Sequence, residues 1–436
     1  MATEAQLIQG GRLLDPATGR DEIGDLLIVE GRIAALGQVE APPSAVVRQA
    51  ANLVVAPGLI DVHVHLREPG FGHKETITTG SAAAAAGGFT TVCAMPNTNP
   101  VLDRPERIAD LWARAEGTAC RVLPIGAATL DNRNETFADF EALREAGCVA
   151  ITDDAFPLQR SEQMADALVR AAEVDLPFIA HCEVRGLSAG GAVDASAGSW
   201  APGVSTQATL AEAAAIRLWA LAYERAAARA SRLPRLHLAH LSSALGVEAL
   251  RALKAAEARV SAETAPHYLT LDSSAVRRFG ANAKMNPPLR SPEDVAAIRE
   301  ALAEGTIDCL ATDHAPHTPE EKALPLDQAP FGVIGLETAL AVCLTALASE
   351  APLAKLVGWL STRPAELFGL PGGTLTVGAP ADLVILDPGA RWTVSPDAFH
   401  SKGRNCPFAG REVYGRVCAT FVAGRRGCGV MADGNE

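Results

Sequence analysis

Two histidines near the start of the chain have a spacing suited to metal binding. His63 and His65 alternate with valines in the run Val62-His63-Val64-His65. Alternate side chains of a β-strand share a face, so both imidazoles point the same way. Neighbouring imidazoles are good ligands for a divalent metal, whereas they pack poorly in a core. Taken alone, the pair is equally compatible with two core histidines that are satisfied by hydrogen bonds.

Further metal-ligating side chains follow other short apolar runs. His181 follows FIA, His240 follows HLA and Asp313 follows LAT. Four histidines and one carboxylate converging from separate strands would suit two divalent metals, with zinc favoured. Two other histidines lie close to these residues in the sequence, but the alternation of side chains along a strand predicts that they face away from the metal site. His237 is expected on the helix-packing side, and His314 is expected to point outward or sideways.

Two metals in one site need a bridging anion in addition to a bridging hydroxide. A carboxylated lysine on the fourth strand serves in many barrel enzymes, but no lysine occurs between Lys74 and Lys254. The fourth apolar run ends instead in Asp153 and Asp154. Adjacent residues of a strand point to opposite faces, so only one of the two can bridge. Strand geometry alone does not select which.

The elements that must position these residues alternate along the middle of the chain. Short apolar runs, from GLIDVHVH to TIDCLATDHAPH, are separated by amphipathic or alanine-rich stretches. This alternation predicts an α/β fold, a (β/α)8 TIM barrel over residues 56–368, with its chemistry at the carboxyl ends of the strands. An open doubly wound sheet would gather polar residues near its switch point instead.

The two ends of the chain have a different sequence pattern from the middle. Residues 1–55 and 369–436 contain short apolar runs flanked by Gly, Asp or Pro, as in LIQGGRLLD and GTLTVGAPADLVILD. Such runs are typical of short strands joined by tight turns. We therefore predict one small β-sandwich domain formed from both termini.

Composition excludes several classes of function. The net charge of −13 argues against a nucleic-acid or anionic-membrane surface, and no apolar tract is long enough to span a bilayer. The nine cysteines include no CxxC pair, which is typical of reduced thiols and not of a disulfide framework. No signal peptide is evident at the start of the sequence. We expect a cytoplasmic protein without nucleic-acid or membrane partners.

Seven motifs, spread in order over nearly the whole chain, resemble those of class I dihydroorotases in the amidohydrolase superfamily. They are DVHVHLREPGFGHKETITTG, CAMPNTNPV, AITDD, AHCE, KMNPPLR, TDHAPHT and FGVIGLET. The resemblance implies a metal-loaded barrel with a β-sandwich built from both ends. It also implies reversible hydrolysis of (S)-dihydroorotate to N-carbamoyl-L-aspartate in de novo pyrimidine (UMP) biosynthesis.

The resemblance further implies roles for individual residues. Two zinc ions per subunit would be bridged by Asp154 and hydroxide, and Asp313 would be the catalytic proton carrier. The implied metal ligands are His63, His65, Asp154, His181, His240 and Asp313. The implied substrate contacts are His65, Arg67, Asn97, Asn286, His317, Phe331 and Gly332. Arg67 would bind the substrate carboxylate as a bidentate donor. Its alternative role is a surface salt bridge with Glu68 or Glu75, and that of both asparagines is a turn beside proline.

Other functions and partners remain open from the sequence. One alternative is another cyclic amidase, of the hydantoinase or allantoinase type. A second is an inactive dihydroorotase-like scaffold for aspartate carbamoyltransferase, although such subunits lose metal ligands that this chain keeps. Dihydroorotate and N-carbamoyl-L-aspartate are the expected small-molecule partners. A homodimer and a complex with aspartate carbamoyltransferase are both family behaviours.

One segment departs from the family pattern. Val184 follows the AHCE motif where relatives have an aspartate, and the next stretch, SAGGAVDASAGSWAPGVSTQAT, keeps only a loose likeness. Its richness in Gly, Ala and Ser predicts a mobile loop.

Overall fold

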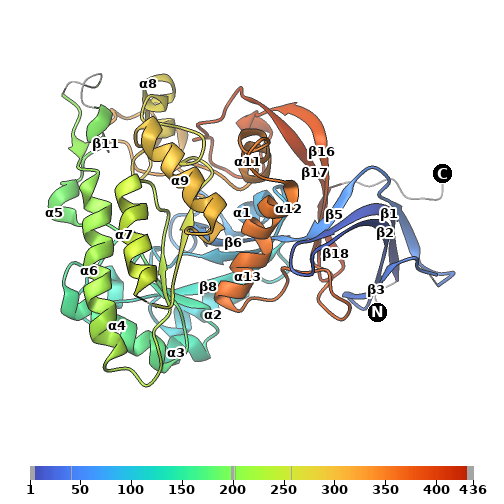
Figure 1. Cartoon of the computed structure of the whole chain (residues 1–436), viewed down its shortest axis with the longest axis horizontal. Helices are drawn as coiled ribbons and strands as arrows, with labels where there is room; N and C mark the ends of the chain where they lie inside the picture. The colour runs from blue at the N-terminus through green and yellow to red at the C-terminus, as the bar shows by residue number, and fades with distance from the viewer. Residues whose placement is uncertain (1–4, 41, 198–200, 202, 257, 430–436) are drawn as a thin grey trace.

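A computed structural model describes residues 5–40, 42–197, 201, 203–256 and 258–429. Eight parallel strands in sequential order form the central sheet (Figure 1). They are β6 (Leu59–Val64), β7 (Phe89–Ala94), β8 (Arg121–Ala127), β9 (Ala150–Thr152), β10 (Phe178–Ala180), β13 (Leu236–Leu238), β14 (Val260–Thr264) and β15 (Cys309–Leu310).

The sheet closes between its first strand and the residues that follow its last. The His65 amide donates to the His314 carbonyl at 2.8 Å. The buried Asp61 carboxylate accepts from the amides of His63 at 3.0 Å and Thr312 at 3.2 Å. Burial raises the pKa of Asp61 to about 7. Since these bonds join β6 to the segment after β15, the predicted (β/α)8 barrel is confirmed.

Helices cover the outside of the barrel between successive strands (Figure 1). The longer ones are α1 (Ile77–Ala86), α2 (Pro105–Arg114), α4 (Ser161–Glu173), α6 (Leu210–Ala227), α7 (Ala244–Ala255), α9 (Pro292–Glu304) and α11 (Ala339–Ala346). The short ones are α3 (Phe140–Glu145), α5 (Arg185–Ser188), α8 (Ala275–Phe279), α10 (Pro319–Lys322), α12 (Leu353–Val357) and α13 (Arg363–Phe368). Several begin at a side-chain cap: Thr76, Ser291 and Thr318 each form a capping box.

The barrel interior is apolar at one end and polar at the other. Ile60, Val62, Ile125 and Ile179 pack there with Phe368, at the end of α13, in one buried cluster. These side chains close the amino end of the barrel. The metal-ligating candidates are left at the carboxyl ends of the strands, where the loops can shape a cavity.

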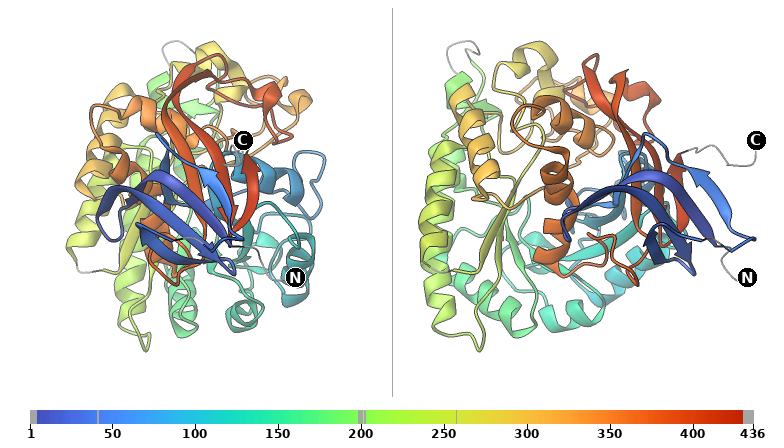
Figure 2. Two further views of the ribbon diagram at one scale, coloured as in Figure 1. Left: turned by 90° about the vertical axis from the view of Figure 1, so that its right-hand side faces the viewer. Right: turned by 45° about the vertical axis from the view of Figure 1, so that its right-hand side comes forward.

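A second sheet contains both ends of the described chain. Its strands are β1 (Gln6–Asp15), β2 (Arg20–Val29), β3 (Arg32–Gly37), β4 (Val46–Gln49), β5 (Val54–Pro57), β16 (Leu383–Thr393), β17 (Glu412–Val422) and β18 (Arg425–Gly429). Figure 2 shows the early and late strands side by side. The two groups join where β5 pairs with β16, so both ends share one continuous eight-stranded sheet around its own apolar cluster.

We propose that the boundaries between the small domain and the barrel lie near residues 55 and 368. β5, the last strand of the small domain before the barrel, ends at Pro57, and β6 of the barrel begins at Leu59. α13 ends at Phe368, before the chain returns to the small domain. No helix among the described residues has both the length and the apolar character required to cross a membrane.

A buried carboxylate fastens the small domain to the barrel. Asp382, whose side chain is 1% exposed, accepts from Arg121 of β8 at 2.9 Å and from the Ala423 amide at 2.7 Å. Asp382→Ala would leave the Ala423 amide without its acceptor and would leave Arg121 with Thr91 but without its carboxylate partner, so we expect a loss of about 1–3 kcal/mol in the free energy of unfolding. Urea unfolding measures this loss.

Asp21→Ala is the matched control, since Asp21 forms an exposed ion pair with Arg12 within the small domain. It should change stability less than Asp382→Ala does. Equal effects from the two variants would contradict the fastening role of Asp382.

Candidate metal centre and active site

The six predicted metal ligands meet at the carboxyl end of the barrel. His63 and His65 come from β6 and the residue after it; the other four come from the segments after β9, β10, β13 and β15. All six are buried: His63, His65, Asp154, His181, His240 and Asp313. His240 and Asp313 have φ of 37° and 47°, in the left-handed region that non-glycine residues rarely adopt. Such conformations are often retained at functional sites.

Asp154 lies between two groups of histidines. Its Oδ1 is 3.5 Å from His63 Nε2 and from His181 Nδ1, and 3.8 Å from His240 Nε2. Its Oδ2 is 3.6 Å from His65 Nε2. The ligand atoms therefore form two clusters that share this carboxylate: His63, His65 and Asp154 in one, and Asp154, His181 and His240 in the other. This is the arrangement expected of a carboxylate that bridges two cations.

Asp313 lies beside the first cluster. Its Oδ1 lies 3.2 Å from His65 Nε2 and 3.6 Å from His63 Nε2. Burial alone would raise the pKa of Asp313, but His65 and His63 hold it well below its ordinary value. The carboxylate is therefore ionised at neutral pH.

The donor set fits divalent metal ions. His63 Nε2 is buried without a hydrogen-bond partner in the described structure, although it faces two carboxylates. His181 Nδ1 and His240 Nε2 lie 2.9 Å apart, so at most one proton fits between them. Cations bound by these nitrogens would satisfy the lone pairs and the carboxylates together.

The structure separates the two aspartates that strand geometry left open. Asp153 turns away from the clusters and accepts from the amides of His181 at 3.0 Å and Leu158 at 2.8 Å. Burial raises the pKa of Asp153 to about 7, whereas three histidines overcome burial and hold the pKa of Asp154 well below its ordinary value. Asp154 thus contacts the histidines of both clusters, whereas Asp153 binds the backbone at the strand end that carries His181.

Three of the predicted ligand histidines have a polar partner at their second ring nitrogen. His65 Nδ1 lies 2.9 Å from Asn97 Oδ1, and the Asn97 amide donates to Asp154 at 3.2 Å. His181 Nε2 lies 3.0 Å from Glu183 Oε2. His63 Nδ1 lies 2.7 Å from Glu263 Oε1. Such partners fix the tautomer and the ring orientation of a metal ligand.

Glu183 and Glu263 were missed by the sequence reasoning. Glu183 lies inside the AHCE motif, directly after His181-Cys182, and Glu263 is the last residue but one of β14. Their positions at strand ends were therefore an available signal. Their partners, however, could not be read from the sequence, because His63 and Glu263 are 200 residues apart.

The prediction for His237 was wrong. Its Nε2 lies 3.2 Å from Glu263 Oε2, and its ring packs on Phe368 with centroids 4.9 Å apart, so it faces the barrel interior. The prediction assumed that residues alternate between two faces from His237 to His240. This alternation fails because β13 ends at Leu238 and His240 has a left-handed backbone. His314 does point sideways: its Nε2 lies 3.4 Å from Glu75 Oε2.

The cavity next to the clusters has a volume of about 290 Å³. It is lined by six of the seven predicted substrate contacts: His65, Arg67, Asn97, Asn286, Phe331 and Gly332. His317 stands behind this wall, with its Nε2 3.1 Å from the guanidinium of Arg67 and 2.8 Å from the Phe331 carbonyl. Glu183 and Arg185 also line the cavity and were not predicted to do so.

Arg67 is not a surface residue held by a salt bridge. Its Nε donates to the Pro316 carbonyl at 3.1 Å, and burial lowers its pKa to about 10, so it stays charged at neutral pH. Asn286 accepts from Gln207 at 2.9 Å and donates to Glu183 at 3.1 Å. Asn286 therefore belongs to the cavity wall and not to an isolated turn.

The divergent segment after Glu183 contains short elements in its described part. These are α5 (Arg185–Ser188), β11 (Val193–Asp194) and β12 (Thr206–Gln207). Asp194 forms a fully buried ion pair with Arg290, and Gln207 reaches Asn286. Gly198, Ser199, Trp200 and Pro202 lie outside the described residues, and the mobility of the segment stays a prediction.

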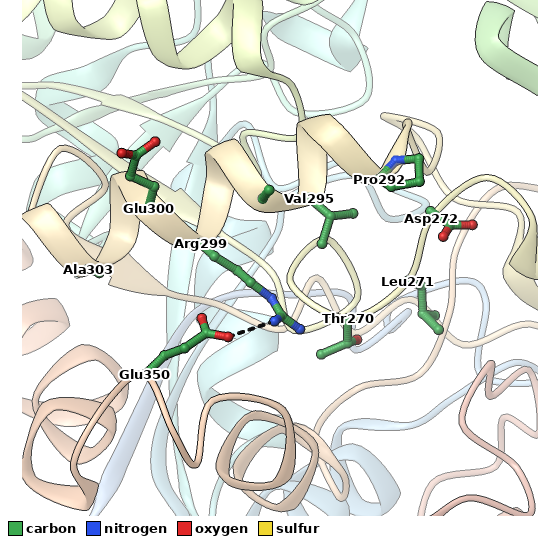
Figure 3. A pocket seen from close by; sticks show the side chains of 10 residues that line it. Thr270, Leu271, Asp272, Pro292, Val295, Arg299, Glu300, Ala303 and Glu350 are labelled. Atoms are coloured by element: carbon green, nitrogen blue, oxygen red, sulfur yellow. Dashed lines mark hydrogen bonds and ion pairs between the residues drawn. The ribbon is translucent and has the colours of Figure 1, made fainter.

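A larger groove elsewhere on the surface lacks this chemistry (Figure 3). It has a volume of about 780 Å³ and lies between α9 and the segments around Leu271 and Glu350. The Arg299 side chain crosses this groove and donates a hydrogen bond to Glu350 at 2.9 Å. It also donates to the Leu269 carbonyl at 2.6 Å. Its lining contains no histidine and no cysteine, so it offers only carboxylates as metal ligands.

Comparison with known proteins agrees with this geometry. Residues 52–204 match the family described as dihydro-orotase-like. Over 421 residues, 96% of this chain, the sequence is 45% identical to the dihydroorotase of Syntrophotalea carbinolica and 42% identical to that of Listeria monocytogenes, covering 98% and 97% of those proteins. The chain belongs to the dihydroorotase family.

Solved structures extend this likeness to the fold. The L-hydantoinase of Arthrobacter aurescens superposes with a TM-score of 0.86 at 25% identity, covering 99% of this chain and 98% of that one. The D-hydantoinase from a Thermus species gives 0.84 at 28% identity, with coverage of 99% and 97%. As a dihydroorotase family member, the chain is a metal-dependent cyclic amide hydrolase.

Asp154→Ala should lose most of its bound metal, because the Asp154 oxygens lie against the histidines of both clusters. Asp153→Ala should retain most of its metal, since its carboxylate contacts only backbone amides. Metal content after dialysis, measured by inductively coupled plasma mass spectrometry, distinguishes the variants. The reverse pattern would show that Asp153 is the bridge.

Proposed function

We propose that this chain is a class I dihydroorotase that hydrolyses (S)-dihydroorotate reversibly to N-carbamoyl-L-aspartate in de novo pyrimidine biosynthesis. The observation that carries the proposal is a guanidinium, Arg67, on the wall of the cavity that also holds a carboxylate shared by two histidine clusters. A substrate that fits this arrangement has an amide for the metal side and a carboxylate for Arg67. Dihydroorotate has both.

We assign the two metal positions to zinc, with His63, His65 and Asp313 at one, His181 and His240 at the other, and Asp154 bridging both. Imidazole and carboxylate ligands suit zinc. When bound, the two ions would lower the pKa of water to near neutrality and polarise the substrate carbonyl. Their stoichiometry of two per subunit is part of the proposal and follows from the two ligand clusters.

Asp313 is proposed to move the proton. It lines the cavity and is held ionised by His65 and His63. An ionised carboxylate in this place can accept a proton from the attacking water and deliver it to the departing ring nitrogen. This proton transfer needs no serine or cysteine nucleophile, and Cys182 is buried in the core outside the barrel.

The remaining cavity residues are proposed to hold the ring. Arg67 would bind the substrate carboxylate. Asn97, Asn286 and His65 would contact the ureide part of the ring. Phe331 and Gly332 also line the cavity. Gly332 has a φ of 132°, and a Cβ there would lie 2.7 Å from the Ala315 Cβ, so only glycine fits this approach.

Arg67 and Asp154 favour a dihydroorotase over its alternatives. Hydantoin carries no carboxylate to pair with Arg67, and the bridging position holds aspartate where a carboxylated lysine is usual for hydantoinases. The inactive-scaffold alternative is disfavoured by the complete ligand set. Association with a second copy or with aspartate carbamoyltransferase stays a prediction from the family resemblance.

The purified protein should hydrolyse dihydroorotate and should act on hydantoin only weakly. A chelator should abolish this activity, and Zn²⁺ should restore it, since the hydrolytic water depends on the metals. Absorbance assays on both substrates, before and after chelation, test the proposal. Turnover of hydantoin without turnover of dihydroorotate would overturn it.

Arg67→Gln should lower kcat/KM for dihydroorotate by on the order of 10²-fold, because the substrate carboxylate would be buried without its cation. Arg67→Lys should recover little, since an ammonium cannot reproduce the bidentate geometry. Metal content should match that of the unsubstituted protein, because Arg67 is not a metal ligand. Steady-state kinetics and metal analysis of the same preparations provide both readings.

Gly332→Ala should raise the KM for dihydroorotate, because the added methyl would push the Phe331–Gly332 wall away from Ala315 and His317. The kcat should change less than KM, since the substitution does not touch Asp313 or a metal ligand. A fall in kcat alone would contradict the assignment of Gly332 to the substrate wall.

A further inference from the structure

A chain of buried hydrogen bonds lies beneath the metal centre, inside the barrel. Glu263 of β14, which is 1% exposed, accepts through Oε1 from His63 Nδ1 at 2.7 Å. Its Oε2 lies 3.2 Å from His237 Nε2, and His237 Nδ1 lies 2.7 Å from Ser261 Oγ. One carboxylate thus joins a predicted metal ligand, His63, to a histidine that touches no metal position.

The surroundings make this carboxylate costly unless it is paired. His237 packs on Phe368, and Val62, Ile179 and Ala311 fill the same interior layer. An unpaired carboxylate in such a layer would be strongly destabilising. Both Glu263 oxygens are instead matched to imidazole nitrogens, so the pairing holds the side chain in one position.

The pairing also determines which nitrogen of His63 carries the proton. A carboxylate accepts hydrogen bonds and does not donate them, so the proton of a neutral His63 lies on Nδ1. The lone pair of Nε2 then faces Asp154 Oδ1 at 3.5 Å and Asp313 Oδ1 at 3.6 Å. His63 Nε2 has no hydrogen-bond partner within the described structure, as a ligand nitrogen should not.

This anchor differs from those of the other ligand histidines. His65 is held by the neutral amide of Asn97, and His181 by Glu183, whose side chain is 14% exposed at the cavity wall. His240 Nδ1 has no partner among the described residues. Glu263 is fully buried and negatively charged, and a second imidazole, that of His237, holds its other carboxylate oxygen.

An additional metal site does not account for the same residues. The ligand atoms of His237, Glu263 and Cys309 lie within 4.8 Å of one another, as a metal cluster would require. Both nitrogens of His237 and both oxygens of Glu263, however, already have hydrogen-bond partners. Burial also raises the pKa of Cys309 well above its ordinary value, which disfavours a thiolate ligand.

We propose that Glu263, supported by His237, is a positioning residue that locks His63 in its metal-binding tautomer and thereby strengthens metal binding at the position formed with His65. The inference rests on the proposed metal-dependent function of the site. It does not depend on which cyclic amide the site hydrolyses.

Glu263→Gln tests the proposal with little change in shape. The amide can still accept from His63 and donate to its other neighbour, but it has no charge. Zn²⁺ affinity of the metal-free protein, measured by competition with a chromophoric chelator, should fall about 10–100-fold at one of the two positions. The Co²⁺ absorption spectrum of that position should change as well. Unchanged affinity at both positions would overturn the proposal.

His237→Gln is the second variant. It leaves Glu263 and His63 in place but removes the imidazole that supports the carboxylate from behind, so a smaller loss of affinity at the same position is expected. If Glu263→Gln fails to fold, His237→Gln carries the test, and wild-type Zn²⁺ affinity in that variant overturns the proposal.

Cys309→Ala is the matched control. Cys309 pairs with Glu263 across β14 and β15 and lies in the same layer. It should keep wild-type Zn²⁺ affinity and stoichiometry. A loss as large as that of Glu263→Gln would show that packing of the layer, or a third metal, is responsible, and would overturn the positioning role.

Metal titration keeps this inference separate from the proposed activity. A wild-type protein that binds two Zn²⁺ but does not hydrolyse dihydroorotate would refute the substrate assignment and leave the positioning test valid. Conversely, an active enzyme whose Glu263→Gln variant binds Zn²⁺ normally would refute only the positioning role.

Discussion

The site depends on one buried carboxylate, that of Asp154, surrounded by imidazoles from three strands. Such a cluster is unfavourable by itself, because desolvated carboxylates and ring nitrogens need partners of opposite character. Here two histidine nitrogens face each other at 2.9 Å, and His63 Nε2 has no hydrogen bond. Divalent cations would resolve both conflicts at once, so the requirement for metal follows from the way the polar groups are gathered.

The barrel meets this constraint by holding the predicted ligands at the carboxyl ends of short, buried strands that close into a ring. Apolar side chains fill the amino end of the ring, and Asp61 ties its first strand to the segment after its last. A further layer of polar side chains then fixes the imidazoles: Asn97, Glu183 and Glu263 each hold one ligand histidine. Rigid elements with buried partners are what preorganised metal ligands require.

Two buried lysines, Lys284 and Lys322, hold the segment that lines the cavity at Phe331 and Gly332. Lys284 donates to the carbonyls of Leu326 and Ala329, each at 2.6 Å, and Lys322 donates to those of Ala281 and Pro330, each at 2.8 Å. These bonds hold the segment that carries Phe331 and Gly332. Arg67, whose pKa stays at about 10, places positive charge on the wall of this cavity in a protein whose net charge is −13. This local field suits an anionic substrate.

Local pattern was sufficient for much of this protein. The alternation of strand and helix predicted the barrel, and the composition of the ends predicted a shared β-domain. The spacing of His63 and His65 predicted two imidazoles on one face, and both approach the Asp154 carboxylate. Such patterns can be read locally because side-chain periodicity within an element is a short-range property. Strand geometry left Asp153 and Asp154 open and the family resemblance chose Asp154, but only the tertiary structure gave the different contacts of the two carboxylates, the inward position of His237 and the partnership of Glu263 with His63. Each depends on where a strand ends or on contacts between residues far apart in the chain, and closure of the barrel creates those contacts.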